Sequence, residues 1–481
     1  MPELSRRRRQ AVLAVCCMSL FIVGLDNTIV NLALPSIQRE LGASVSSLQW
    51  TIDAYTLVLA SLLMLSGSMA DRLGRRRTFQ TGLVLFGLGS LLCGVAPSIG
   101  LLIAFRALQA IGGSMLNPVA MSIITNTFTE PKERARAIGV WGGVVGLSMA
   151  IGPVVGGALV GPFGWRSIFW INVPVAIAAV VLTAVLVPES RAPRPRRIDP
   201  VGQLLVIVFL AGLTYGIIEG REAGYGSPRI LGVFALALLA VAVLVPYEQR
   251  RRDPLLELRF FRSAPFSGAT VIAISAMAGL AGFLFVNSLY LQDARGYSAL
   301  HAGLLTLPMA VMTAICAPIS GRLVGSRGAR LPLILAGAGI TVGAAGLSWA
   351  TEGTSVWPLM ACYVVFGFGF GLVNAPITNA AVSGMPRSQA GVAAGIASTS
   401  RQVGASFGVA VIGTVVTARV HGPFSTGFAA ASYVGWWIIA GCGVLVLVLG
   451  LVTTSGWARA TAAKVADGLE DEPSAGLVSA R

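Results

Sequence analysis

The chain has 481 residues, of which 55% are hydrophobic and only 11% charged, and its mean hydropathy is +0.78. A water-soluble protein of this length needs far more charge, so the composition excludes that class and indicates a protein with many membrane spans. The formal net charge of +15 does not indicate a nucleic-acid partner, because the arginines cluster in short segments between apolar runs.

The sequence lacks the residues that several kinds of site require. Of the 35 basic residues only Lys132 and Lys464 are lysines, and neither follows a glycine, so there is no Walker-type phosphate loop. Any pumping must therefore draw on an ion gradient or a separate partner, and we expect no cofactor. His301 and His421 lie far apart, and all six cysteines lie in apolar runs, so we expect buried free thiols and no metal site.

Apolar runs of about 20 residues predict fourteen transmembrane helices. The predicted spans are 11–34, 48–70, 78–96, 99–126, 135–160, 166–187, 201–220, 229–248, 266–290, 300–321, 331–350, 356–381, 391–418 and 432–455. The first run is too long for a secretory signal and is interpreted as an uncleaved helix. An even number of spans places both termini on the same side of the membrane.

The distribution of basic residues supports this topology. With fourteen spans, 27 of the 35 basic residues lie in inner segments, 6 lie in outer segments, and Arg106 and Arg401 lie inside helices. Cytoplasmic segments of membrane proteins carry the excess of lysine and arginine. The bias therefore predicts that both termini are cytoplasmic.

A repeat with a period of 254 residues divides the chain into two related halves. The loop at 67–77 has an echo at 321–331, because the shift carries Gly67 to Gly321 and Gly74 to Gly328. Transporters with a site between two halves are commonly built from such repeats. The repeat predicts an all-α membrane protein of two six-helix bundles with pseudo-two-fold symmetry plus two inserted helices. The expected domains are 1–187, the inserted pair with its basic flanks at 188–262, 263–458, and a cytoplasmic, disordered tail at 459–481.

Three ionisable residues are predicted at one depth in the outer half of the membrane. Asp26, Asp53 and Arg106 each lie within roughly 10 Å of the outer surface at 1.5 Å per helical residue. Charges inside the bilayer are expensive, and two carboxylates with one guanidinium could form a protonatable cluster. The alternatives are interfacial solvation for Asp53 and structural hydrogen bonds to backbone carbonyls for Arg106. Arg401 lies mid-membrane, where structural pairing and substrate contact are equally open.

Helix 5 and the aromatic residues of the second half are further candidates. Gly152, Pro153, Gly156 and Gly157 favour a bend at a moving interface, although close packing alone explains the glycines. Several polar and aromatic side chains are candidates to line a cavity, with packed or lipid-facing rings as the alternative for the aromatic ones. The candidate cavity residues are Asn31, Gln109, Phe283, Asn287, Tyr290, Asn374 and Arg401.

These motifs resemble the fourteen-helix drug–proton antiporter branch of the major facilitator superfamily. The matching stretches are 25–31 with Pro35, 67–76, 106–109 with Gly112, 152–157, 165–169 with Asn172 and Pro174, and 401–404. The chain departs from the family pattern at Ala110 and Ser148, where a glycine is usual, and at Gly325 and Ser326, where the second loop lacks an acid and an arginine. The acidic and basic side chains that would hold this loop in place are therefore present in the first half only.

The resemblance implies a set of roles for these residues. Asp26, Asp53 and Arg106 would couple transport to protons, and 152–157 would form the antiporter bend. The gating loop would contain Gly67, Asp71, Arg72, Gly74 and Arg75, with Asp71 near the start of helix 3 acting on the helix end.

The implied function is proton-coupled export of lipophilic, cationic drugs or antibiotics across a bacterial plasma membrane by a monomer. The alternatives are a dedicated exporter of one self-made natural product and, remotely, a polytopic lipid enzyme. The strong preference for arginine over lysine is typical of GC-rich genomes, where exporters of self-made products are common, but it does not identify a substrate.

Overall fold

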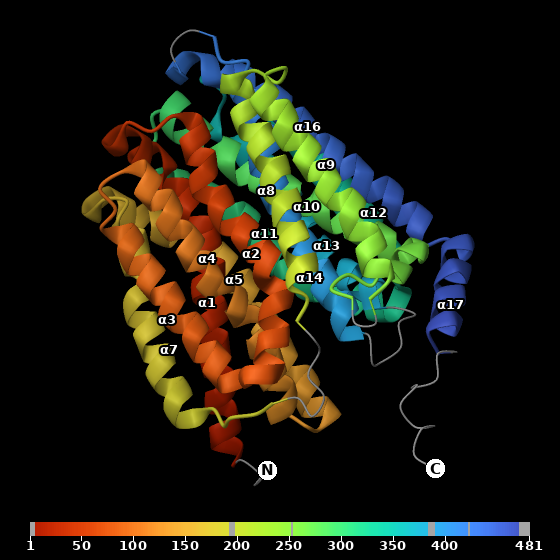
Figure 1. Cartoon of the computed structure of the whole chain (residues 1–481). Helices are drawn as coiled ribbons and strands as arrows, with labels where there is room; N and C mark the ends of the chain where they lie inside the picture. The colour runs from red at the N-terminus through yellow and green to blue at the C-terminus, as the bar shows by residue number, and fades with distance from the viewer. Residues whose placement is uncertain (1–4, 192–197, 252–253, 383–389, 422–423, 471–481) are drawn as a thin grey trace, which may run out of the picture.

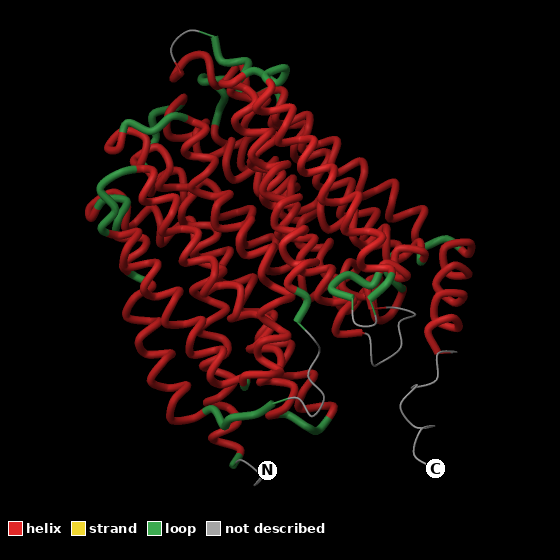
Figure 2. Tube along the Cα trace, in the orientation of Figure 1, coloured by secondary structure: helices red, strands yellow, loops and turns green. Residues whose placement is uncertain are grey.

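The computed structural model describes residues 5–191, 198–251, 254–382, 390–421 and 424–470, and every regular element in these ranges is a helix (Figures 1 and 2). The first half of the chain contains α1 (Arg6–Leu41), α2 (Val45–Leu73), α3 (Arg75–Gly94), α4 (Ile99–Thr127), α5 (Pro131–Phe163), α6 (Ser167–Trp170) and α7 (Asn172–Leu186). The middle contains α8 (Pro200–Ala223), α9 (Pro228–Gln249) and the 3₁₀ turn η1 (Leu258–Arg262). The second half contains α10 (Ala264–Leu289), η2 (Tyr290–Ala294), α11 (Ala299–Arg327), α12 (Arg330–Leu347), α13 (Val356–Val382), α14 (Ala390–Phe407), η3 (Gly408–Ile412), α15 (Gly413–Thr417) and α16 (Phe424–Thr453), followed by α17 (Gly456–Glu470).

Eleven helices within the described residues are long and apolar enough to cross a membrane. The other three predicted spans, 78–96, 135–160 and 391–418, fall on α3, α5 and the α14–η3–α15 run, which are helical but lie outside that set. α3 begins with three consecutive arginines, and the last run is interrupted by the π-helical η3. The count of fourteen spans therefore stays a prediction.

The two loops related by the 254-residue offset share their local geometry, while the division into two bundles stays a prediction. α2 and α11 each contain 29 residues and are offset by the predicted 254 positions. Gly74 and Gly328 end the two helices with φ of 111° and 79°, which only glycine adopts readily. The hydroxyls of Ser44 and Ser298 cap the two helices by accepting a backbone N–H from the third residue of each.

Helix packing follows the same pattern in the two halves of the chain. α4 packs against α2 and α3 and α1 against α5, while α13 packs against α11 and α12 and α10 against α14. Among the pairs that join the halves, α5 packs against α11 and α2 against α14 most extensively. α1 begins, and α17 lies, at the same end of the molecule (Figure 1). We call this the terminal end and the other the distal end.

A buried acid holds the base of the α8–α9 pair together at the terminal end. Asp199 caps α8 by accepting from the Gly202 N–H at 3.0 Å, and it also accepts from Tyr247 Oη at 2.9 Å and Arg251 Nη2 at 3.0 Å. Burial alone would raise the pKa of Asp199, but the Gly202 N–H, Arg251 and Tyr247 together hold this pKa below its usual value.

The expectation of a disordered tail from residue 459 is wrong for its first part. α17 is helical through Glu470, and the Thr461 hydroxyl accepts the backbone N–H of Ala264 at 2.9 Å. Val465 packs against the buried cluster that contains Phe260 and Phe266. An apolar contact and a helix cap therefore tie this segment to α10, while 471–481 lie outside the described residues.

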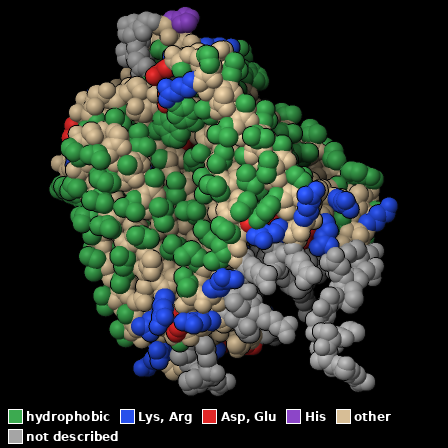
Figure 3. Space-filling model, in the orientation of Figure 1, with side chains coloured by type: hydrophobic (Ala, Val, Ile, Leu, Met, Phe, Trp, Pro, Cys, Tyr) green, Lys and Arg blue, Asp and Glu red, His purple; other side chains and the backbone are tan. Residues whose placement is uncertain are grey.

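The flank of the molecule is apolar and its terminal end is basic. Hydrophobic side chains cover the visible face, and lysine and arginine side chains gather along its lower edge (Figure 3). Leu238 of α9, for example, is 70% exposed. Exposure of this extent at many large apolar residues suits a helix surface that faces lipid rather than water.

Candidate functional site

Asp26 of α1 and Arg106 of α4 form a buried ion pair. Arg106 Nη1 donates to Asp26 Oδ2 at 2.5 Å, and both side chains are at most 2% exposed. The guanidinium also donates from Nε to the Thr51 carbonyl at 3.1 Å, and it lies 4.1 Å from the centre of the Tyr55 ring. A charge buried this deeply is tolerable only when it is paired and hydrogen-bonded, and here each partner supplies the other.

Amide side chains complete the surroundings of Asp26. Gln109 Nε2 donates to Asp26 Oδ1 at 2.9 Å and to Ser90 Oγ at 2.7 Å, while its Oε1 accepts from Arg106 Nη1 at 2.7 Å. Asn172 Nδ2 adds a bond to Asp26 Oδ1 at 3.2 Å. The carboxylate thus accepts three donors, which is the pattern expected for its charged form. Ser90, and the role of Asn172 beside Asp26, were not predicted from the sequence; the only signal was their polarity in apolar helices.

Asp53 does not join this cluster, although it was expected to share it. The side chain lies on α2, where its Oδ1 accepts from Thr56 Oγ1 at 3.4 Å, and it faces Ser406 of α14. Asp53 is fully buried, and its Oδ2 makes no well-aligned hydrogen bond in the part of the chain that the structure describes, although Ser406 lies within reach. The structure therefore separates the acids: Asp26 is paired within the first half, and Asp53 lies at the boundary with the second.

The loop between α2 and α3 is held by an acid that follows α7. Arg75 Nη2 lies 3.0 Å from Asp71 Oδ1, and Glu189 accepts the backbone N–H of Arg76 at 3.2 Å. The prediction that Asp71 lies near the start of helix 3 is wrong, because the backbone bonds of α2 continue to Gly74 and leave Asp71 in the last turn of α2. The Asp71 charge is unfavourable at a helix C-terminus, and Arg75 offsets it. Gly67 is unobstructed, since a Cβ added there would meet no atom within 4 Å.

The Gly-Pro segment of α5 is a site of close backbone approach. A Cβ at Gly157 would lie 2.5 Å from Cα of Leu300 on α11, and one at Gly156 would lie 2.8 Å from Cγ1 of Ile29 on α1. A Cβ at Gly152 would overlap the Thr28 side chain. These glycines allow α5 to touch α1 and α11 at once. Whether Pro153 bends α5 in a moving interface stays a prediction.

Three polar side chains cross between the halves at the distal end. Gln49 Nε2 of α2 donates to the carbonyls of Val409 and Ala410 in the π-helical η3, at 3.0 and 3.1 Å. On α10 and η2, Ser288 donates to the Asn31 carbonyl and Gln292 to the Leu32 carbonyl, the latter at 3.0 Å. All three side chains are buried, so the halves are joined at this end by hydrogen bonds shielded from solvent.

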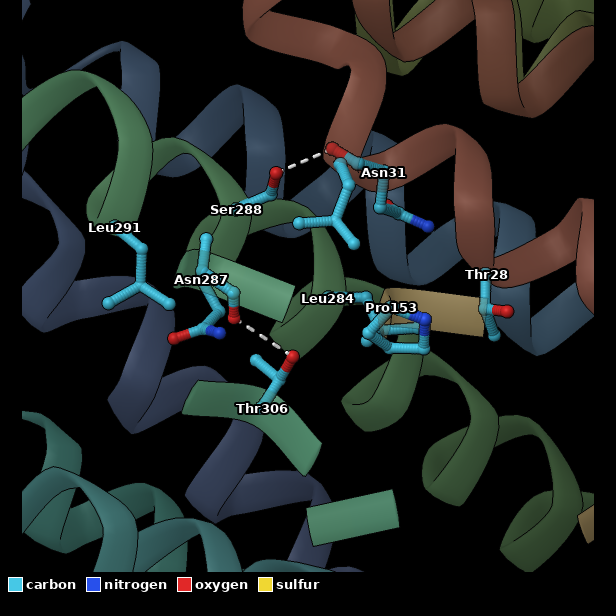
Figure 4. A pocket seen from close by; sticks show the side chains of 10 residues that line it. Thr28, Asn31, Pro153, Leu284, Asn287, Ser288, Leu291 and Thr306 are labelled. Carbon is cyan, nitrogen blue, oxygen red and sulfur yellow. Dashed lines mark hydrogen bonds between the residues drawn. The ribbon is translucent and has the colours of Figure 1, made fainter. Parts of the chain in front are cut away.

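A small cavity lies beside these contacts, between α1, α5, α10 and α11. Its volume of about 20 Å³ has room for about one water molecule. Asn31 and Asn287, two of the predicted cavity residues, line it together with Thr28, Pro153 and Thr306. Figure 4 shows Asn287 and Thr306 pointing toward each other.

The other predicted cavity residues lie elsewhere. Phe283 is packed in an aromatic cluster and stacks on Phe366 at 4.6 Å, and the Tyr290 hydroxyl donates to the Thr351 carbonyl at 2.6 Å. Arg401 Nη2 donates to Thr378 Oγ1 at 2.6 Å. Gln109 belongs to the Asp26 cluster, and Asn374, whose carbonyl accepts from Thr378, is half-buried on α13. Phe283 and Tyr290 are thus packed inside the protein, as the alternative to a cavity lining predicted. Contact of the candidate cavity residues with a substrate stays a prediction.

Comparison with known sequences identifies the family of this chain. The sequence profile of the Major Facilitator Superfamily matches residues 16–409. The multidrug resistance protein Stp of Mycobacterium tuberculosis is 36% identical over 401 residues, covering 83% of this chain and 74% of that protein. The tetracenomycin C resistance and export protein of Streptomyces glaucescens is 37% identical over 437 residues, covering 89% and 79%. The methylenomycin A resistance protein of Streptomyces coelicolor is 35% identical over 400 residues, covering 82% of each chain.

Solved structures share the fold at much lower identity. A bacterial homologue of the human lysosomal transporter Spinster, in an inward-facing and occupied conformation, superposes with a TM-score of 0.68 at 17% identity, covering 96% of this chain and 99% of that one. The D-xylose–proton symporter superposes with a TM-score of 0.65 at 15% identity, covering 93% and 97%.

Proposed function

The chain belongs to the Major Facilitator Superfamily, and from that membership we propose that it is a proton-coupled exporter of lipophilic, cationic drugs or antibiotics. The relatives named for multidrug resistance and antibiotic export support the class of cargo. The buried Asp26–Arg106 pair is the observation that supports the coupling to protons.

The proposed architecture is two six-helix bundles with an inserted pair, fourteen helices in all. α1–α7 would form the first bundle, with α6 and α7 as one span, and α10–α16 the second, with α14, η3 and α15 as one span. The matched packing of the two halves and the 254-residue offset of α2 and α11 support this division. The protein would act as a monomer in the bacterial plasma membrane with both termini in the cytoplasm.

Asp26 is proposed to exchange its proton when its pairing with Arg106 changes. As a carboxylate it holds Arg106, Gln109 and Asn172 in one network joining α1, α4 and α7. Protonation would remove the charge that holds the guanidinium and would free α1 to shift against α4. Such a link between charge state and helix packing is the kind of two-state element that coupling requires.

The structure is proposed to represent an inward-facing state. The contacts of Gln49, Ser288 and Gln292 join the halves at the distal end, which the positive-inside pattern assigns to the outside. By contrast, Gly139 and Gly143 of α5 and Gly321 and Gly325 of α11, toward the terminal end, have no neighbour within 4 Å of an added Cβ. Cargo would then enter from the cytoplasm and leave after the distal contacts break.

Transport in reconstituted vesicles tests this function. We expect an imposed pH gradient to drive uptake of ethidium, a lipophilic cation, into vesicles with an acidic lumen. The uptake should come from protein molecules oriented with the terminal end toward the bath. A lipophilic anion and a neutral dye measured in parallel report the charge preference. D26N should abolish the pH-driven component of ethidium uptake, because an asparagine amide does not take up or release a proton near neutral pH.

A matched charge-neutralising variant controls for nonspecific effects. Glu352 lies exposed in the loop between α12 and α13, so E352Q should transport like the wild type. Wild-type uptake that does not depend on the pH gradient would refute proton coupling. Full pH-driven transport by D26N would show that Asp26 has no role in the mechanism.

A dedicated exporter of one natural product is the second candidate. The Streptomyces relatives are named for resistance to single antibiotics, tetracenomycin C and methylenomycin A, which supports this alternative, whereas the Mycobacterium tuberculosis relative is named for multidrug resistance. Cells expressing the chain would then resist one compound class only, whereas a multidrug exporter would raise the tolerated dose of several unrelated cations. A lipid enzyme has no support in the family assignment.

A further inference from the structure

α8 covers the boundary where the two halves of the chain meet at α2 and α14. It packs against both of these helices. Near its distal end Glu219 accepts from Trp50 Nε1 of α2 at 2.8 Å, and near its terminal end Gln203 donates to the Ser61 carbonyl of α2. Hydrogen bonds toward both ends therefore hold α8 along α2, over the boundary that contains Asp53.

Five buried polar atoms along this boundary make no well-aligned hydrogen bond among the described residues, although the Asp53 and Ser406 side chains lie within reach of each other. They are Asp53 Oδ2 and Ser61 Oγ on α2, Gln203 Oε1 and Thr214 Oγ1 on α8, and Ser406 Oγ on α14. Each of these side chains is at most 6% exposed. A buried polar group left without a partner costs about 1–3 kcal/mol, so a concentration of five at one boundary requires an explanation.

These groups lie on either side of an apolar cluster made by the same three helices. Leu57 and Ala60 of α2 and Leu210 of α8 form its buried core, and Val403 and Phe407 of α14 pack against it. Along α2, the cluster lies between Asp53 and Ser61, which are separated by about 12 Å at 1.5 Å per residue. On α8, Gln203, Leu210 and Thr214 recur at spacings of seven and four residues and so share one face.

The order of these groups along the helices defines a direction. Gln203 lies in the first turn of α8, at the terminal end, and its partner Ser61 lies eight residues from Asp53 toward that same end of α2. A path along the boundary would therefore run from Asp53, past the apolar cluster, to the end of the molecule that contains both termini.

We propose that the boundary between α2, α8 and α14 is a water-filled proton path between Asp53 and the cytoplasm, closed in this structure by the Leu57–Leu210–Phe407 cluster. The path rests on the proposed proton coupling and assigns a role to the inserted helix α8. When the cluster parts, water enters and hydrogen-bonds the five polar atoms. A proton then leaves Asp53 Oδ2, passes along the water to the cytoplasm, and leaves Asp53 as a carboxylate.

The path accounts for the unpartnered atoms where simple packing does not. If this boundary served only for packing, apolar side chains of the same shape would make it more stable. Replacing polar groups that lack partners by apolar groups of the same shape is nearly neutral or stabilising. Buried waters typically make two to four hydrogen bonds to otherwise unsatisfied polar groups. This suits Ser61 and Gln203 on one side of the cluster and Asp53, Thr214 and Ser406 on the other. An apolar constriction that excludes water is also an effective barrier to ion movement.

The first test opens the barrier. Leu210→Ala removes a buried side chain from the cluster, and Leu204→Ala makes the same substitution on α8 at a residue that is 59% exposed. Vesicles loaded with the pH dye pyranine and given an acid bath without drug should acidify several-fold faster with L210A. The shorter side chain thins the apolar barrier, so waters bound to the polar atoms on its two sides can reach each other. L204A should match the wild type.

A second substitution tests whether the leak passes through Asp53. D53N in the L210A background should return acidification to the wild-type rate. A leak that persists in the double variant would overturn the path while leaving proton coupling intact. Loss of all pH-driven transport by the wild type would instead refute the proposed function.

The third test does not depend on a cavity mutant folding. Thr214→Val keeps the shape of the side chain and deletes an unpartnered buried hydroxyl, so thermal unfolding in detergent should show equal or greater stability. In the path, the same change removes a water ligand, so pH-driven transport should slow several-fold and need a steeper gradient. Unchanged transport by T214V would overturn the proposal.

Discussion

The distal contact of Gln49 offers a prediction whose size follows from the structure. Gln49→Ala removes an amide that donates to the Val409 and Ala410 carbonyls and lies 3.3 Å from Thr414 Oγ1. Two buried hydrogen bonds contribute about 0.5–1.5 kcal/mol each, so the closed distal end should lose about 1–3 kcal/mol relative to an open one. That difference corresponds to a shift of about 5- to 150-fold in the ratio of the two states.

Spin-label distance measurements across the distal end can read this shift. Pro97 and Glu352 are exposed in loops that connect α3 to α4 and α12 to α13, so nitroxides there report the separation of the halves. In a cysteine-free background, Q49A should add a population at longer distance. Gln10→Ala, an exposed glutamine at the terminal end, provides the control. A Q49A distance distribution identical to that of the wild type would refute the reasoning that these bonds hold the end closed.

Three further predictions concern other parts of the structure. In a double-mutant cycle, D26N and R106Q should each destabilise the protein by about 3–5 kcal/mol, since each leaves its partner buried without a counter-charge, and the double variant should recover part of the loss; additive effects in thermal unfolding would contradict the pairing. Gly157→Ala should slow or abolish transport while expression persists, because its Cβ would lie 2.5 Å from Leu300 Cα; normal transport rates would contradict this contact. Asp199→Asn should lower the unfolding temperature at neutral pH. Folding lowers the pKa of Asp199, so the stability that its carboxylate contributes is present above its ordinary pKa of about 3.9 and is lost as the pH falls through the folded value. The difference in unfolding temperature between the variant and the wild type should therefore disappear in acid.

Local chemistry made the loops after α2 and α11 predictable. Their glycines allow the sharp turn that Gly74 and Gly328 make, although the predicted spans stopped at 70 and 321, before the helices end. Counting residues along the helices placed Asp26 and Arg106 at one level, and the two side chains do pair. Asp71 was misplaced because a hydrophobic run ends where the lipid ends, whereas a helix ends where its backbone bonds stop, at Gly74.

The grouping of the charges could not be predicted in the same way. Asp26 and Asp53 have similar expected depths, yet one faces Arg106 and the other faces Ser406. Which of its neighbours a side chain meets depends on helices that are distant in the sequence, and the pattern along one helix does not identify them. Asn172 was missed as a partner of Asp26 for the same reason, since it reaches the carboxylate from α7.

The approach of α5 to α11 involves the main chain on both sides. A Cβ at Gly303 would overlap the Pro153 carbonyl, and one at Gly157 would meet the Leu300 backbone. Atoms that every amino acid possesses cannot be retuned by exchanging side chains, so drug-driven adaptation should leave these two glycines untouched while residues that touch cargo diversify. Lineages selected on unrelated toxic compounds should therefore keep this contact between α5 and α11, and few substitutions could give resistance to an inhibitor that binds there.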